Sequence, residues 1–302
     1  MALPTETVYG LGADASNELA VRRIFAVKGR PSSHPLIVHV VSLEEARRWV
    51  RAVPETAETL GRALWPGPLT LVLWRSALAS DAVTGGQDTV AVRVPGHPLA
   101  IELLEAFGGG IAAPSANRFG RLSPTTADHV RAELGDEVDV VLDGGPCSVG
   151  VESTIVDLTG PTPRLLRPGG ISVETLEGLL GAPVPLAGAA SDVRAPGMLE
   201  SHYAPRAGVR LVEAGSVEGK ALEAVAAGLR PVILAPKGLR LDARLVSLEV
   251  PEDDAGFARV LYARLREADE LGDLLLVVPP SETGLGLAVA DRLRRAAAPR
   301  GS

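Results

Sequence analysis

The chain has 302 residues, of which 46% are hydrophobic and 22% charged, and its formal net charge is -7. This composition is typical of a globular protein of roughly two domains, and the acidic balance argues against a dedicated nucleic-acid binder, because phosphate neutralisation dominates such affinity. Cys147 is the only cysteine, which excludes an internal disulfide and a zinc-cysteine cluster and fits a reducing cytoplasm. We expect neither a signal peptide nor a membrane-spanning segment, because the sequence shows no such apolar run.

The first part of the chain alternates apolar runs, which predict strands, with helical spacings that end at glycine or proline. A glycine-rich motif lies so close to Met1 that we expect the N-terminus to be truncated. In chain order we predict a strand and turn at 5–12, a helix at 17–27, a strand at 35–41, helices at 43–50 and 55–65, strands at 69–74 and 89–95, a helix at 97–107, a segment of small residues at 111–117 whose backbone a ligand could approach, a helix from 123 to about 134, strands at 138–142, 149–157 and 165–167, and a helix at 172–180.

Residues 183–205 are rich in proline, glycine and alanine and lack periodicity, so they predict a linker. The linker also contains a histidine and a tyrosine, at 202 and 203, which suggests that residues 196–205 fold over a site as a lid. Beyond it, segments at 209–212, 217–227, 231–235, 255–271, 274–278 and 286–297 alternate between strand and helix. That pattern predicts a small three-layer α/β domain with a mostly parallel sheet, to which we assign no cofactor because it has no glycine-rich phosphate fingerprint.

Two cations, Lys28 and Arg30, flank Gly29 immediately after the first predicted helix. In an extended segment both side chains would point the same way, and an ammonium beside a forked guanidinium suits a polyphosphate. The alternative is a solvated basic turn.

Three segments carry polar side chains that are candidate site residues. Thr89 and Arg93 alternate with core valines, and Arg93 is a candidate carboxylate clamp or else a surface ion pair. His39 ends an apolar strand and is either a satisfied core residue or a site residue. Ser115 and Asn117 offer a hydroxyl and an amide two residues apart.

The roles of three other residues are open from the sequence. Ser123 is expected at or just before a helix N-terminus, as a cap or as an anion contact. Thr7 is either a local backbone partner or a ligand contact. Ser153 has no Gly-x-Ser-x-Gly context, so we interpret it as a hydrogen-bonding group rather than a nucleophile.

A set of motifs in fixed order resembles the threonylcarbamoyl-AMP synthases, whose catalytic unit is a YrdC-like domain. The motifs are PTETVYGLG at 4–12, KGRP at 28–31, PSAN at 114–117, VESTI at 151–155, LRPG at 166–169 and HYAP at 202–205. The resemblance covers nearly the whole chain and implies the two-domain form of the family. The implied fold class is α/β: a catalytic domain with a strongly twisted mixed sheet at 1–186, a linker or lid at 187–207, and a small Rossmann-like three-layer domain at 208–302.

The resemblance implies that L-threonine, bicarbonate and ATP yield threonylcarbamoyl-AMP and pyrophosphate, for the threonylcarbamoyladenosine modification of tRNA position 37. It implies Mg²⁺ on the ATP phosphates without a protein-bound metal, a downstream threonylcarbamoyl-transferase complex as partner, tRNA contact that is at most weak, no membrane, and a cytoplasmic location. The implied catalytic tetrad is Lys28, Arg30, Ser115 and Asn117. The implied ATP contacts are this tetrad with His34, Thr89, Ser123, Arg167 and Tyr203, and the implied threonine contacts are Thr7, His39, Arg93, Ala113 through its backbone, and Ser153.

Two other functions remain open at this point. A carbamoyl-transfer domain of the hydrogenase-maturation type would share the fold, but such proteins carry cysteine-rich zinc modules. An RNA-binding module or ribosome-associated factor would use the concave face of the same fold, against which the aromatic content of 3% and the net charge of -7 argue.

Overall fold

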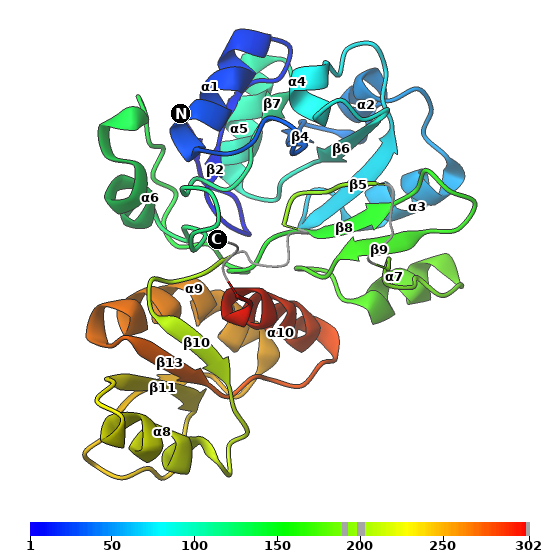
Figure 1. Cartoon of the computed structure of the whole chain (residues 1–302). Helices are drawn as coiled ribbons and strands as arrows, with labels where there is room; N and C mark the ends of the chain where they lie inside the picture. The colour runs from blue at the N-terminus through cyan, green and yellow to red at the C-terminus, as the bar shows by residue number, and fades with distance from the viewer. Residues whose placement is uncertain (189–192, 198–202, 300–302) are drawn as a thin grey trace. The chain divides into compact units, whose positions relative to one another are not determined.

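The computed structural model describes residues 1–188, 193–197 and 203–299. The chain forms two compact units, shown in Figure 1. The first unit comprises Met1–Phe119 and Ser123–Met198, and the second comprises Gly120–Leu122 and Leu199–Ser302. Each unit has its own sheet and its own hydrophobic core.

The first unit is built on a seven-stranded mixed sheet with strand order β3-β7-β4-β6-β5-β8-β9. The pairs β4–β6 and β5–β8 are parallel and the other neighbours are antiparallel. Its strands are β3 (Ala13–Asp14), β4 (Ile37–His39), β5 (Leu69–Trp74), β6 (Thr89–Arg93), β7 (Ile111–Ala112), β8 (Thr154–Asp157) and β9 (Arg164–Arg167), beside a two-stranded sheet of β1 (Ala2–Leu3) and β2 (Gly10–Leu11).

Several helices of this unit begin at side-chain caps that the sequence supplies. Asn17 caps α1, Ser42 caps α2, Thr126 caps α6 and Ser172 caps α7, each by accepting a hydrogen bond from a backbone N–H of the first turn. The helices are α1 (Glu18–Lys28), α2 (Leu43–Ala46), η1 (Arg47–Trp49), α3 (Glu55–Leu64), α4 (Asp81–Thr84), α5 (Pro98–Phe107), α6 (Ala127–Leu134), η2 (Gly135–Glu137) and α7 (Val173–Leu180).

The two faces of the large sheet have different coverings. One face, which includes Val38 and Val92, belongs to the main apolar cluster together with residues of α1, α3, α6 and α7. The other face includes Ile37 and Ala91, and it packs against Ala195 of the segment 193–197. Because side chains alternate along a strand, this second face also receives the polar strand-end residues discussed below.

The second unit contains a four-stranded parallel sheet of order β10-β13-β11-β12. Its apolar strand residues pack against α8 on one side, and α9 and α10 contact each other and the sheet. The elements are β10 (Gly208–Leu211), α8 (Val217–Ala226), β11 (Pro231–Pro236), β12 (Val246–Val250), α9 (Asp254–Leu271), β13 (Leu274–Val277) and α10 (Gly284–Ala297).

The α/β class predicted from the sequence is confirmed, and most element boundaries agree within a few residues. Two expectations about elements are wrong, and the elements β1, β3, α4 and β12 were not predicted. Residues 138–142 form only an isolated bridge, between Ala2 and Val141. The helix expected from Ser123 begins at Ala127, because Thr126 and not Ser123 is its cap. Within the described residues, no helix has the length and apolar character needed to cross a membrane.

Gly169 packs closely against the backbone of residues 152–154, and a substitution can test this packing. A Cβ at this position would lie 2.3 Å from the Thr154 nitrogen and 2.4 Å from the Glu152 oxygen. Gly169→Ala should therefore lower the free energy of unfolding by about 1–3 kcal/mol, the usual cost of overpacking. Gly178→Ala in α7 is the matched control, because a Cβ there meets no atom within 4 Å, and it should stabilise by about 0.5–1 kcal/mol. Urea denaturation measures both, and equal stabilities of the two variants would contradict this account.

Candidate functional site

Lys28 and Arg30 are buried at a helix end, which corrects the expectation of an extended segment and also excludes the alternative of a solvated turn. Lys28 is the last residue of α1, and Gly29 adopts the left-handed conformation that ends the helix. The two side chains are 3% and 7% exposed. The tight helix end, rather than a strand, therefore carries both cations into the interior, where removal from water raises the free energy of their charged forms.

The Lys28 ammonium joins the two segments predicted to form the tetrad. Its Nζ donates to the carbonyl oxygens of Ser115 and Asn117, each at 2.5 Å. Burial, and then the nearby Arg30, lower the pKa of Lys28 well below its ordinary value. The structure thus brings Lys28, Ser115 and Asn117 together, although the contacts that it shows use backbone carbonyls.

Arg30 is held at one side of this cluster by an aromatic residue that sequence reasoning missed. Its Nη2 donates to the Pro35 carbonyl at 3.0 Å, and its guanidinium lies 5.9 Å from the centroid of the Phe119 ring. The same ring meets His34 edge-on at 5.4 Å, and the Phe119 N–H donates to the Lys28 carbonyl at 2.8 Å. Burial, followed by Arg30 and Arg194, lowers the pKa of His34.

His39, Thr89 and Arg93 are all buried on the sheet face opposite the main apolar cluster. His39 lies beside Arg93 in the β4–β6 register. Burial, with a smaller contribution from Arg93, lowers the pKa of His39 to about 3, so its imidazole is neutral near pH 7. Ala113 adjoins these strands, and its N–H donates to the Ile37 carbonyl at 3.0 Å.

Arg93 is paired with Glu6, which the sequence analysis did not select. Arg93 Nη2 donates to Glu6 Oε1 at 2.7 Å, and the other carboxylate oxygen accepts from the Gly96 N–H at 2.9 Å. A buried guanidinium needs such a partner, because an unpaired buried charge is costly. Nearby, the Thr7 hydroxyl lies 2.8 Å from the Thr5 hydroxyl, so its local partner is a side chain and not the backbone.

Ser123 is buried away from the helix terminus where it was expected. Its hydroxyl donates to Glu152 Oε1 at 2.6 Å, and α6 begins four residues later. Glu152 was quoted only as part of the VESTI motif. A carboxylate inside a motif of small and polar residues was the signal that could have identified it, as was true of Glu6 in PTETVYGLG.

Ser153 and Arg167 are in direct contact. Arg167 Nη2 donates to the Ser153 carbonyl at 2.8 Å and to its hydroxyl at 3.2 Å. Arg167 Nη1 donates to the Pro196 carbonyl at 2.9 Å. Arg194 also anchors the segment 193–197, because its guanidinium donates to the Ser33 and Gly85 carbonyls. The segment 193–197 therefore crosses the polar sheet face within the first unit.

Tyr203 is buried within the second unit. Its ring centroid lies 5.9 Å from that of Tyr262, and the Arg292 guanidinium lies 5.0 Å above it. These contacts are those of a packed residue, and the predicted role of Tyr203 in nucleotide binding stays a prediction. Met198 and His202 of the predicted lid lie outside the described residues.

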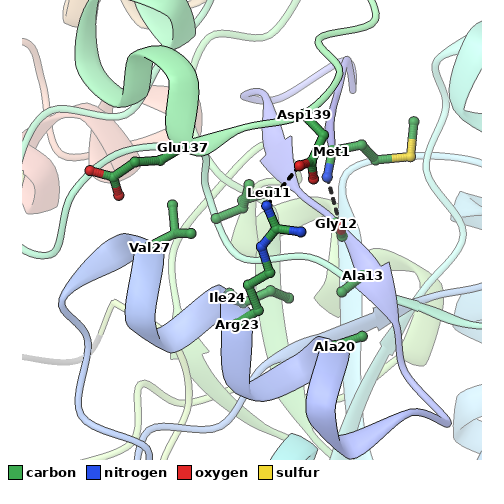
Figure 2. A pocket seen from close by; sticks show the side chains of 10 residues that line it. All are labelled: Met1, Leu11, Gly12, Ala13, Ala20, Arg23, Ile24, Val27, Glu137 and Asp139. Atoms are coloured by element: carbon green, nitrogen blue, oxygen red, sulfur yellow. Dashed lines mark hydrogen bonds and ion pairs between the residues drawn. The ribbon is translucent and has the colours of Figure 1, made fainter.

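A separate pocket of about 160 Å³ lies between α1 and the residues after β2. Figure 2 shows its apolar floor and, at its rim, the ion pair of Arg23 with Asp139 and the Met1 ammonium bound to the Gly12 carbonyl. None of the predicted site residues lines it. Within the described residues no group of three or more His, Cys, Asp or Glu side chains could hold a metal ion.

Nearly the whole chain is similar to known proteins. Residues 1–169 match the family model described as "Telomere recombination", and residues 171–298 match "Threonylcarbamoyl-AMP synthase, C-terminal domain". Relatives named threonylcarbamoyl-AMP synthase are 43% identical in Pyrococcus abyssi, over 98% of this chain and 89% of the relative, and 39% identical in Bacillus subtilis, over 99% and 90%.

The structure of this chain is also similar to a solved structure. The crystal structure of P. abyssi Sua5 complexed with L-threonine matches with a TM-score of 0.93 and 42% identity, over 98% of this chain and 89% of that one. The likeness in sequence and in structure therefore extends through both units. The chain belongs to the threonylcarbamoyl-AMP synthase family.

Proposed function

We propose that this protein makes threonylcarbamoyl-AMP and pyrophosphate from L-threonine, bicarbonate and ATP. The observation that carries the proposal is the buried Lys28 ammonium, which lies near the buried Arg30 and donates to the carbonyl oxygens of Ser115 and Asn117. The relatives named as synthases over nearly the whole chain support it. They do not favour the alternative of an RNA-binding module.

The reaction requires charge neutralisation more than a covalent nucleophile. Threonine and bicarbonate condense to a carbamate with loss of water, and a carbamate oxygen then attacks the α-phosphorus of ATP as pyrophosphate leaves. Lys28 has three N–H donors, of which two bind carbonyl oxygens, and no third hydrogen bond of this ammonium is formed among the described residues. The remaining donor, together with the Arg30 guanidinium, would bind phosphate oxygens of ATP.

In the proposed threonine pocket, Arg93 would bind the carboxylate by charge, and uncharged groups would bind the rest of the amino acid. Glu6 occupies one Nη2 donor of Arg93, and Nη1 has no hydrogen-bond partner in the part of the chain that the structure describes, so it could bind the threonine carboxylate. His39 is neutral near pH 7 and offers hydrogen bonds without competing for that carboxylate. Thr7 and Ser153 would supply the other polar contacts.

Mg²⁺ would enter with ATP rather than as a resident ion. It prefers substrate phosphates, water and one or two carboxylates to a dedicated site built from protein ligands alone. The product would pass to a threonylcarbamoyl-transferase complex that acts on tRNA, and a cytoplasmic location follows from that role.

The function itself is tested by pyrophosphate release. Purified protein with ATP and Mg²⁺ should release pyrophosphate only when both L-threonine and bicarbonate are present, because the carbamate is the attacking group. A coupled phosphate assay in bicarbonate-depleted buffer measures each omission. Release at the full rate without threonine would contradict the proposal.

Arg30→Lys tests the phosphate assignment, since it retains the charge but removes the forked donor set. We expect the KM for ATP to rise by about tenfold to a hundredfold, in line with charged hydrogen bonds, and the KM for threonine to stay nearly constant. Arg22→Ala is the matched control, because it removes a charge from α1, the helix that precedes Arg30, at a side chain that is 68% exposed. An unchanged KM for ATP in Arg30→Lys would remove Arg30 from the ATP site.

Amino-acid selectivity tests the polar pocket. A site that hydrogen-bonds a hydroxyl rejects an analogue without it, because its own buried groups are then unpaired. We therefore expect kcat/KM to fall in the order threonine, serine, valine, with valine lower than threonine by about a hundredfold or more. Competition assays with the three amino acids measure this order, and equal turnover of valine and threonine would contradict the pocket.

A further inference from the structure

Two fully buried hydroxyl groups, those of Thr70 and Ser153, face each other on adjacent strands. Thr70 belongs to β5, and Ser153 immediately precedes β8, its parallel neighbour. Their Oγ atoms lie 2.7 Å apart, and the residues are 0% and 1% exposed. The sequence analysis selected Ser153 for the threonine pocket and did not select Thr70.

Thr70 lies on the same sheet face as the other predicted threonine contacts. Val72, two residues further along β5, packs with Ile37 and Ala91 on that face, and alternation places Thr70 on the same side as Val72. The same rule places Arg93 on the side of Ala91. Thr70 is therefore positioned between the strand that carries Arg93 and the strand that follows Ser153.

The number of hydroxyl protons determines what this pair can offer to a ligand. Each hydroxyl has one proton to donate, and Arg167, which can only donate, supplies a further proton to Ser153. Only one of the two hydroxyl protons can be used between Thr70 and Ser153, whichever of them donates. Among the described residues neither hydroxyl has another acceptor, so one buried proton remains without a partner. Buried donors are rarely left in that state.

We propose that Thr70 and Ser153 act as one hydrogen-bonding unit that donates its spare proton to an acceptor oxygen of the amino-acid substrate. This rests on the proposed threonine pocket and adds Thr70 to it as a specificity residue. The donor can come from either hydroxyl, so the unit keeps one donor when either partner alone is removed. It loses the donor only when both are removed.

A double-mutant cycle with Thr70→Val and Ser153→Ala tests this, with two readouts whose couplings have opposite signs. For L-threonine binding, measured by calorimetry without ATP, each single variant should weaken affinity by at most about threefold. The double variant should weaken it by about tenfold or more, beyond the product of the single effects. For stability, each single variant leaves an unmatched buried hydroxyl, whereas the double variant removes both, so its loss should be smaller than the sum.

A pair with only a structural role would give the stability coupling without the coupling in binding. Thr70→Ser should retain the wild-type threonine affinity, because it keeps the hydroxyl. The exposed hydroxyl pair of Ser172 and Thr175 is the matched control, and removing both of these hydroxyls should leave threonine affinity unchanged. Multiplicative effects on threonine affinity in the Thr70–Ser153 cycle would overturn the inference while leaving the proposed function intact. Absence of threonine binding by the native chain would overturn the pocket itself.

Discussion

The structure of the site depends on the desolvation of two neighbouring cations. Lys28 and Arg30 are buried at the end of α1, and the carbonyl oxygens that face Lys28 compensate its charge only in part. Its lowered pKa expresses this cost. A polyphosphate would relieve the repulsion between the two cations, so the same arrangement that is expensive in the free protein favours binding of an anion.

The seven-stranded sheet determines where the proposed threonine contacts lie. One face is closed by helices around a continuous apolar core, and the other receives His39, Thr89 and Arg93 from neighbouring strands by simple alternation. On this second face the charges are matched locally: Glu6 binds Arg93, and the His39 imidazole is neutral. Under the proposed function, Lys28 and Arg30 would attract the ATP phosphates, Arg93 would bind the threonine carboxylate, and hydrogen-bond geometry would discriminate between amino acids.

The sequence predicted the fold class, most elements and the alternation of Thr89 and Arg93, because hydrophobic period and glycine or proline stops are local signals. It did not predict that Lys28 ends a helix in the interior, because burial of a lysine depends on carbonyls at Ser115 and Asn117, far along the chain. Glu6, Thr70, Phe119 and Glu152 were missed for the same reason. Each acquires its role from a partner that only the tertiary structure brings near, and no spacing rule connects them.

The identity of the covalent product tests the central claim most directly. The protein would be incubated with ATP, Mg²⁺, L-threonine and ¹³C-bicarbonate, and the quenched mixture analysed by mass spectrometry. This account predicts an adenylate that contains both threonine and a single ¹³C atom. An adenylate of threonine without ¹³C, which would mean direct activation of the amino-acid carboxylate, or AMP alone, would contradict it.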